Sequence, residues 1–214
     1  MEEKVLMDNI SLFNKAAAAA AFETSAYVPS QLIPSDKPEI VFSGKSNVGK
    51  SSMINRLVSR KGLAKVSSEP GKTASINFYD CGFFRLVDLP GYGYAKVSKK
   101  DKEKWSELIE GYFGQNRNIK LVVQLVDVRR EPSQDDVLML DYLTQNNLPF
   151  VVALTKTDKL KATQLAKRKI EVPKELSFCS PKIIFTSADN GMGIDELKSE
   201  IVHACYKNNL EDGE

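Results

Sequence analysis

Gly44-Lys45-Ser46-Asn47-Val48-Gly49-Lys50-Ser51 is a complete G-x-x-x-x-G-K-[ST] loop, and it decides the fold of this chain. The apolar run 40–42 precedes the loop directly, and a helical pattern begins at Ser51. A strand, a glycine-rich turn and a helix in this order point backbone N–H groups and the positive end of the helix at a phosphate. We predict that Lys50 reaches the outer phosphates and that Ser51 places its hydroxyl on Mg²⁺. An ordinary glycine-rich turn is the alternative interpretation.

Composition and charge indicate one globular domain. The chain has 214 residues, of which 42% are hydrophobic and 27% charged, and its formal net charge is only +2. A nucleic-acid partner would therefore need a local basic patch. Three widely spaced cysteines without C-x-x-C pairing indicate reduced thiols, and no signal peptide, lipidation motif or membrane-spanning run is recognisable. We expect a cytoplasmic, monomeric protein without a membrane anchor.

Short apolar segments alternate with helical patterns along most of the chain. Strands are expected at residues 40–43, 76–79, 83–87, 121–126, 150–154 and 183–186, and helices at 51–59, 98–113, 133–145, 162–169 and 193–206. This alternation predicts an α/β fold in three layers, with a mixed, mostly parallel sheet, helices on both faces and ligand loops at the carboxyl ends of the strands. We divide the chain into an N-terminal extension (1–37), a nucleotide-binding domain (38–208) and an acidic tail (209–214).

A second motif, Asp88-Leu89-Pro90-Gly91, stands at the end of a predicted strand. An aspartate in this place can hold a water on Mg²⁺, and the N–H of Gly91 can meet a γ-phosphate, so the loop would sense whether that phosphate is present. The same residues also form an ordinary turn. Upstream, Pro70-Gly71-Lys72-Thr73 lies in a polar stretch suited to a mobile loop, and Thr73 is a candidate second hydroxyl ligand of Mg²⁺.

Two further strand ends carry a pattern for base recognition. One strand ends in Thr155-Lys156-Thr157-Asp158, and another ends in Thr186-Ser187-Ala188. In an [NT]-K-x-D motif the carboxylate accepts hydrogen bonds from the ring N1–H and the 2-amino group of guanine, while the lysine stem packs across the ring. Adenine lacks both donors and would leave the buried acceptor unpaired, so a selectivity of roughly 10⁴ is attainable. The sequence therefore predicts a guanine nucleotide, with the backbone of Ser187-Ala188 at the guanine carbonyl.

These elements, in this order, resemble the pattern of the translation-factor-related P-loop GTPases, which have a Ras-like fold. More narrowly, the chain resembles the EngB/YihA type of ribosome-assembly GTPase, within the TrmE-Era-EngA-EngB-Septin-like group. The closer resemblance rests on the segments 44–52, 70–73, 88–95 (Asp-Leu-Pro-Gly-Tyr-Gly-Tyr-Ala) and 155–158, and residues 22–27 resemble the extra leading strand of the family. The similarity extends from about residue 20 to residue 208. One departure is Ala74, where relatives commonly have glutamine.

The resemblance implies hydrolysis of GTP to GDP and phosphate, with Mg²⁺ held by Ser51, Thr73 and, through a water, Asp88. It assigns catalysis to Lys50, Thr73, Gly91 and Asn47. The nucleotide-binding residues are then Gly44, Lys45, Ser46, Asn47, Val48, Gly49, Lys50, Ser51, Ser52, Gly71, Lys72, Thr73, Ala74, Ser75, Asp88, Leu89, Pro90, Gly91, Thr155, Lys156, Thr157, Asp158, Thr186, Ser187 and Ala188.

Two positions bear on the rate of hydrolysis. Tyr92 stands where many signalling GTPases have the glutamine that orients the attacking water, so we expect slow intrinsic turnover that needs help. Asn47 occupies the loop position where potassium-stimulated relatives place an asparagine. Its carbonyl would hold K⁺ against the phosphates and so add positive charge. Equal hydrolysis rates in sodium and potassium buffers would exclude this role.

A run of lysines follows the γ-phosphate-sensing loop: Lys96, Lys99, Lys100, Lys102 and Lys104. Such faces are usually just solvated, but the resemblance makes this one a candidate contact to ribosomal RNA in a maturing large ribosomal subunit. It also implies a need for the protein in normal growth, division or septation. Three alternatives stay open: a P-loop ATPase or nucleotide kinase, a GTP-dependent scaffold with negligible hydrolysis, and a GTPase acting on tRNA modification or cell division machinery.

Overall fold

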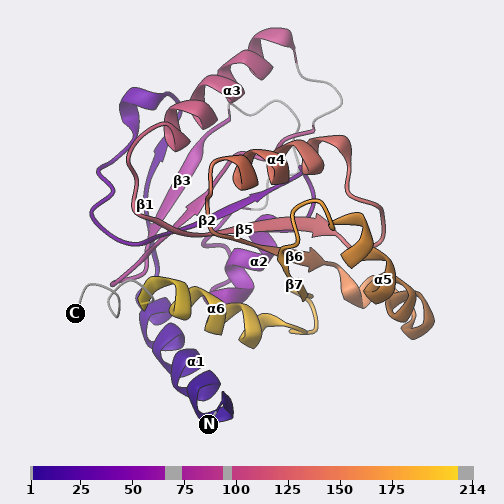
Figure 1. Ribbon diagram of the computed structural model, residues 1–214. Coiled ribbons are helices and arrows are strands. Elements are labelled where there is room, and N and C mark those ends of the chain that lie inside the picture. The colour runs from indigo at the N-terminus through magenta and orange to yellow at the C-terminus, as the bar shows by residue number, and fades with distance from the viewer. Residues whose placement is uncertain (1, 66–73, 94–97, 207–214) are drawn as a thin grey trace.

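The computed structural model describes residues 2–65, 74–93 and 98–206 (Figure 1). Its strands are β1 (Ala21–Ala26), β2 (Glu39–Gly44), β3 (Ile76–Asp80), β4 (Arg85–Asp88), β5 (Ile119–Asp127), β6 (Phe150–Thr155) and β7 (Lys182–Phe185). Its α-helices are α1 (Glu2–Ala18), α2 (Lys50–Leu57), α3 (Lys99–Phe113), α4 (Gln134–Gln145), α5 (Ala162–Glu175) and α6 (Ile194–Tyr206). Two short 3₁₀ turns, η1 (Pro29–Gln31) and η2 (Thr157–Lys159), complete the described elements.

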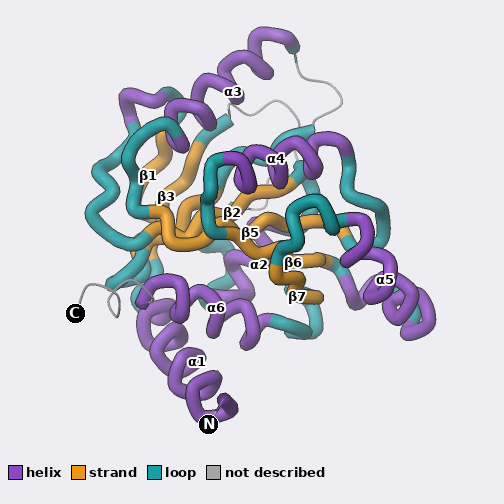
Figure 2. The backbone as a smooth tube through the Cα atoms, viewed as in Figure 1, coloured by secondary structure: helices purple, strands orange, loops and turns teal. Residues whose placement is uncertain are grey.

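All seven strands lie in one sheet, in the order β1-β3-β4-β2-β5-β6-β7. The strands from β4 to β7 in this order are parallel to one another, whereas β3 runs antiparallel to both β4 and β1. Figure 2 shows this sheet flanked by helices on both sides. The predicted mixed, mostly parallel sheet in three layers is therefore confirmed.

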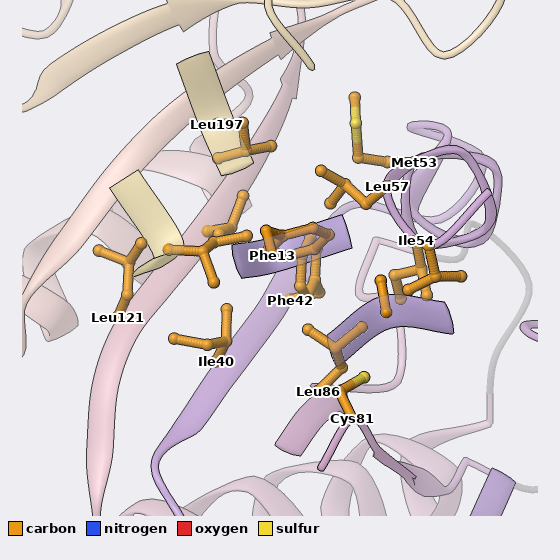
Figure 3. Close-up of a cluster of buried hydrophobic side chains, with 14 of the residues drawn as sticks. Phe13, Ile40, Phe42, Met53, Ile54, Leu57, Cys81, Leu86, Leu121 and Leu197 are labelled. Atoms are coloured by element: carbon orange, nitrogen blue, oxygen red, sulfur yellow. The ribbon is translucent and has the colours of Figure 1, made fainter. Parts of the chain in front are cut away.

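The alternation of side chains along the central strands divides the core between the two faces of the sheet. Ile40 and Phe42 of β2 pack with α1, α2 and α6 in one cluster, shown in Figure 3. Val41 lies between them and packs in the cluster beneath α3 and α4 on the opposite face. A third cluster joins α4 and α5 to β5 and β6. Continuous apolar strands are buried on both faces because helices cover both.

The N-terminal extension packs on both an edge and a face of the sheet. Strand β1 pairs with β3 at the edge of the sheet, and α1 lies along α6. Phe13 of α1 is completely buried, and Lys198 Nζ donates to Asn14 Oδ1 at 2.8 Å. We propose that residues 1–37 form a unit that folds onto the domain 38–208. The predicted tail, 209–214, lies outside the described residues.

A buried ionic cluster fastens the segment before β2 to the sheet. Arg117 donates to both carboxylate oxygens of Glu39, with distances of 2.9 Å from Nε and 2.6 Å from Nη2. The phenol of Tyr112 donates to Glu39 Oε2 at 2.7 Å, and Arg117 Nη2 also donates to the carbonyl of Ile33 at 3.1 Å. Glu39 is fully buried, so its charge is compatible with the core only because these donors surround it.

Helix α5 is longer than the sequence predicts. The expectation of a helix over 162–169 is wrong at its carboxyl end, because the helix continues to Glu175 and includes Pro173. Proline normally disfavours a helix interior. Here Val172 is completely buried against β5 and β6, and Arg168 forms ion pairs with Glu171 and Glu175 across the same turns. Tertiary packing therefore outweighs the local preference of the proline.

No helix among residues 2–65, 74–93 and 98–206 is both long and apolar enough to cross a membrane.

Serine side chains cap the N-termini of α4 and α3. Ser133 Oγ accepts from the N–H of Asp136 at 3.4 Å in a complete capping box, and Ser98 Oγ accepts from the N–H of Asp101 at 3.1 Å. These caps fix where α4 and α3 begin.

Arg117→Met should lower the free energy of unfolding by about 3–5 kcal/mol, because it leaves the carboxylate of Glu39 buried without its main partner. Urea unfolding measures this. The control is Lys167→Met, which removes an exposed ion pair with Glu171 and should cost well under ~1 kcal/mol. Equal stability losses in the two variants would contradict a structural role for the buried pair.

Candidate nucleotide-binding site

A cavity of ≈ 350 Å³ opens at the carboxyl ends of the parallel strands. Val48 and Gly49 line it from the loop between β2 and α2, and Ser52 lines it from the first turn of α2. Lys156 and Asp158 line it from the segment after β6. Ala188 and Asp189, after β7, complete this side of the wall. The structure thus brings together the phosphate-loop motif and both predicted base-recognition segments.

The phosphate loop has the backbone shape that its glycines permit. Gly49 adopts a φ of 106° as the N-cap of α2, a conformation that costs glycine little. A Cβ atom on Gly91 would lie 3.2 Å from the backbone nitrogen of Ser46, so the second motif packs directly on this loop. The N–H of Ser46 also donates to the carbonyl of Tyr92 at 2.8 Å. The two predicted phosphate-binding motifs are therefore in backbone contact.

Lys50 and Asp88 form an ion pair at the junction of these two motifs. Both side chains are largely buried, at 12% and 7% exposure, so the pair is held in a low-dielectric environment. The hydroxyl of Ser51 makes no hydrogen bond with another described residue. A carboxylate and a free hydroxyl are the hard oxygen ligands that Mg²⁺ prefers. The residues present therefore fit a magnesium ion, and the ammonium of Lys50 fits a phosphate.

One carboxylate oxygen of Asp158 accepts a hydrogen bond and the other does not. Ser187 Oγ donates to Asp158 Oδ1 at 2.6 Å. Lys159 Nζ lies 2.8 Å from Oδ2 but outside hydrogen-bonding angles, so this buried oxygen accepts no hydrogen bond from the residues that the structure describes. The pKa of Asp158 is lowered mainly by Lys159 and to a smaller extent by Ser187, so the carboxyl is ionised near neutral pH. An ionised, pre-oriented acceptor matches a base with adjacent N–H donors.

Further hydrogen bonds tie the predicted base-recognition segments to the phosphate loop and to each other. Thr155 Oγ1 donates to the carbonyl of Val48 at 2.8 Å, and Lys156 Nζ donates to the carbonyl of Asn47 at 2.6 Å. Thr157 Oγ1 donates to the carbonyl of Thr186 at 3.0 Å. These side chains position the loops, a role that their place in the sequence motif does not reveal.

Asp127 is a site residue that the sequence analysis missed. It stands at the end of β5, and its carboxylate accepts from Lys156 Nζ at 3.0 Å and from Arg129 Nη2 at 2.7 Å. Burial alone would raise the pKa of Asp127, but these donors hold it well below its ordinary value. The available signal was an aspartate at the end of an apolar strand, the same placement that singled out Asp88.

The phenol of Tyr92 points away from the phosphate loop. Its hydroxyl donates to Asp136 Oδ1 at 2.6 Å and accepts from Gln124 Nε2 at 2.5 Å, and the residue is only 8% exposed. Burial, together with the carboxylate of Asp136, raises the pKa of Tyr92 far above its ordinary value, so the hydroxyl stays protonated. The side chain therefore anchors its loop to β5 and α4.

Gly71, Lys72 and Thr73 of the predicted nucleotide-binding residues lie outside the described residues. Lys96 of the predicted basic patch does so as well. Ala74 and Ser75 are described, directly before β3, and neither lines the cavity. Ser75 Oγ instead donates to Asn77 Oδ1 at 3.3 Å.

Tyr92→Phe should lower the free energy of unfolding by about 1–3 kcal/mol, because Asp136 and Gln124 lose a buried hydrogen-bond partner. Tyr142→Phe is the matched control, since the Tyr142 hydroxyl makes no hydrogen bond with another described residue. Denaturant midpoints of the two variants measure the difference. A Tyr92→Phe protein as stable as the control would show that the phenol does not anchor the loop.

Comparison with known proteins agrees with this geometry. The family model described as "50S ribosome-binding GTPase" matches residues 39–156. A probable GTP-binding protein EngB of Gemmatimonas aurantiaca is 48% identical over 166 residues, which cover 77% of this chain and 81% of that protein. Its counterpart in Caldanaerobacter subterraneus is 47% identical over 180 residues, with coverages of 83% and 92%.

Solved structures show the same fold. A crystal structure of a probable GTP-binding protein engB superposes with a TM-score of 0.66 at 27% identity, covering 79% of this chain and 99% of that one. Era of Aquifex aeolicus, bound to GDP and AlF₄⁻, superposes with a TM-score of 0.60 at 20% identity over 78% of this chain and 56% of that one, which shows the fold alone. The sheet, the phosphate loop and the relatives together establish that this chain has the Ras-like P-loop fold and belongs to the EngB family of GTP-binding proteins, and that it is a GTPase.

Proposed function

We propose that this GTPase is a switch in the assembly of the large ribosomal subunit, and that GTP hydrolysis times one step of that assembly. The observation that carries the proposal is the cluster of lysines at the start of α3, next to the loop that would sense the γ-phosphate. The description of the matched family as 50S ribosome-binding supports the same partner.

The lysines of α3 stand where they are electrostatically unfavourable for the helix itself. All four are exposed in the first turns of the helix: Lys99, Lys100, Lys102 and Lys104. Among the described residues, a single ion pair includes one of them, that between Lys99 and Glu103 at 4.0 Å. The N-terminus of a helix carries a partial positive charge, so cations there reduce helix stability. Local folding does not account for these charges, whereas a phosphate backbone would neutralise them.

Side-chain contacts connect the basic start of α3 to the phosphate-sensing loop. Trp105 Nε1 donates to the carbonyl of Pro90 at 3.1 Å, and the Trp105 and Tyr92 rings meet edge to face with centroids 6.3 Å apart. A change at Gly91 on gain or loss of the γ-phosphate would therefore be transmitted to α3. This is the coupling that a nucleotide-dependent affinity for RNA requires.

For the reaction itself, we assign positioning and charge neutralisation to the phosphate loop. Lys50 would turn from Asp88 to the outer phosphates when GTP binds, which frees Asp88 to hold a water of the magnesium shell. Ser51 and Thr73 would supply the hydroxyl ligands. Bound Mg²⁺ supplies positive charge that offsets charge on the transferring phosphoryl group. Asn47 remains the proposed K⁺ ligand. The buried phenol of Tyr92 does not face the phosphate loop, which supports a slow intrinsic rate.

Asp158→Asn should reverse base preference from guanine to xanthine nucleotides, because an amide can donate to the 2-oxo group of xanthine in place of accepting from the 2-amino group of guanine. Calorimetric titration with GDP and with XDP measures the change, which we expect to exceed ~100-fold in the ratio of affinities. An unchanged preference for GDP would remove Asp158 from the base site.

Co-sedimentation with purified large ribosomal subunits or their precursors tests the partner. Binding should be stronger with a non-hydrolysable GTP analogue than with GDP and should fall steeply with salt. Changing the four α3 lysines to glutamine should reduce the salt slope of the logarithm of the binding constant by about 3, since each phosphate contact contributes ~0.7–0.9. The matched control changes Lys4, Lys15, Lys167 and Lys174 to glutamine. Equal slopes for the two quadruple variants would contradict RNA contact through α3.

A further inference from the structure

Lys159 lies between two carboxylates at the rim of the cavity. Its Nζ is 2.8 Å from Asp158 Oδ2 and 3.4 Å from Asp189 Oδ2. Lys159 and both aspartates line the cavity. The G-domain motif ends at Asp158, so the predicted site did not include Lys159 or Asp189.

The surroundings of Asp158 distinguish this arrangement from an ordinary surface ion pair. Asp158 is 12% exposed, whereas Asp189 is 75% exposed. Both carboxylates lie close to the ammonium of Lys159, so they are near each other and would repel each other without that ammonium. Ser187 contacts both residues: its Oγ donates to Asp158 Oδ1 at 2.6 Å and accepts from the backbone N–H of Asp189 at 3.1 Å.

Asp158 Oδ2 has lone pairs that accept no hydrogen bond from the described residues, which indicates that a ligand is expected to donate to it. Lys159 Nζ lies 2.8 Å from this oxygen but does not donate a hydrogen bond to it at a favourable angle, and no other described residue donates to it. A buried carboxylate oxygen without a donor is costly unless a ligand supplies one. The ammonium therefore balances the charge of the carboxylate and leaves its acceptor capacity to a ligand.

We propose that Lys159 is a positioning residue for guanine recognition, which shields Asp158 from Asp189 and holds it ionised and oriented while Oδ2 stays open to the N–H donors of the base. This inference rests on the assignment of Asp158 to the base, proposed above. It adds a specificity determinant that lies outside the T-K-x-D motif.

The proposal has a pH dependence of defined sign. An ionised Asp158 is needed to accept from the base, so affinity is present above the pKa of Asp158 and is lost as the pH falls through it. Lys159 is the largest cause of the lowered pKa of Asp158. Its removal leaves the carboxylate of Asp189 as a neighbouring negative charge, with Arg129, Asp127 and Lys156 in the adjoining cluster, and the pKa of Asp158 rises. Binding should then weaken from a higher pH.

GDP binding by Lys159→Gln, measured by calorimetry with Mg²⁺ between pH 8 and pH 4, tests this inference. We expect affinity about threefold weaker than in the unaltered protein at pH 7, as for a partly exposed ion pair, and a deficit that widens as the pH falls. Lys159→Arg should retain most of the affinity. Lys174→Gln is the control, since it removes an exposed ammonium that does not line the cavity. Circular dichroism at each pH verifies that the variants are folded.

The outcomes separate this inference from the assignment on which it rests. Affinity equal to that of the control, tighter binding, or a loss that is the same at every pH would each overturn the role of Lys159. If Asp158→Asn switches to xanthine nucleotides while Lys159→Gln binds GDP normally, the Lys159 inference alone fails. If Asp158→Asn does not switch, the assignment of the base site fails as well.

Discussion

The parallel alignment of β4, β2, β5, β6 and β7 is the constraint on which the site depends. Neighbouring parallel strands all end at the same edge of a sheet, so the loops that follow them must meet there. The register brings Asp88 opposite Phe42 of β2, and Asp127 opposite Thr155. The strand register thus brings residues far apart in the sequence to the same edge. The antiparallel strand β3 begins at the same edge.

Side chains of the motifs themselves then join the converging loops. Thr155 and Lys156 each donate to a carbonyl of the phosphate loop, so the part of the cavity expected to hold the base and the part expected to hold the phosphates are braced against each other. The γ-phosphate-sensing loop is held differently. It is in backbone contact with the phosphate loop, through Ser46 and Tyr92, and it also contacts α4 through Tyr92 and α3 through Trp105. The loops of the binding cavity are therefore joined to one another, whereas the γ-phosphate-sensing loop is also joined to helices at the protein surface.

Much of the fold and part of the site could be predicted because their signals are local. Glycine spacing, apolar strands and polar strand ends identify the phosphate loop and Asp158 without reference to any partner. The carboxyl half of α5 could not be predicted, since Pro173 disfavours a helix and the burial of Val172 depends on strands elsewhere. Asp127 and Lys159 belong to no motif, so their approach to Lys156 and Asp158 emerges only in three dimensions.

The sequence by itself determined the layered α/β architecture, the phosphate loop and the order of the segments along the site, because strand periodicity and glycine-rich turns act over a few residues. Only the tertiary structure decided where the side chains at those strand ends point. Tyr92 follows the glycine of its motif, yet its phenol turns to Asp136 and Gln124 because their buried polar groups require a partner. Lys159 likewise lies close to both Asp158 and Asp189, which another strand brings to the same edge.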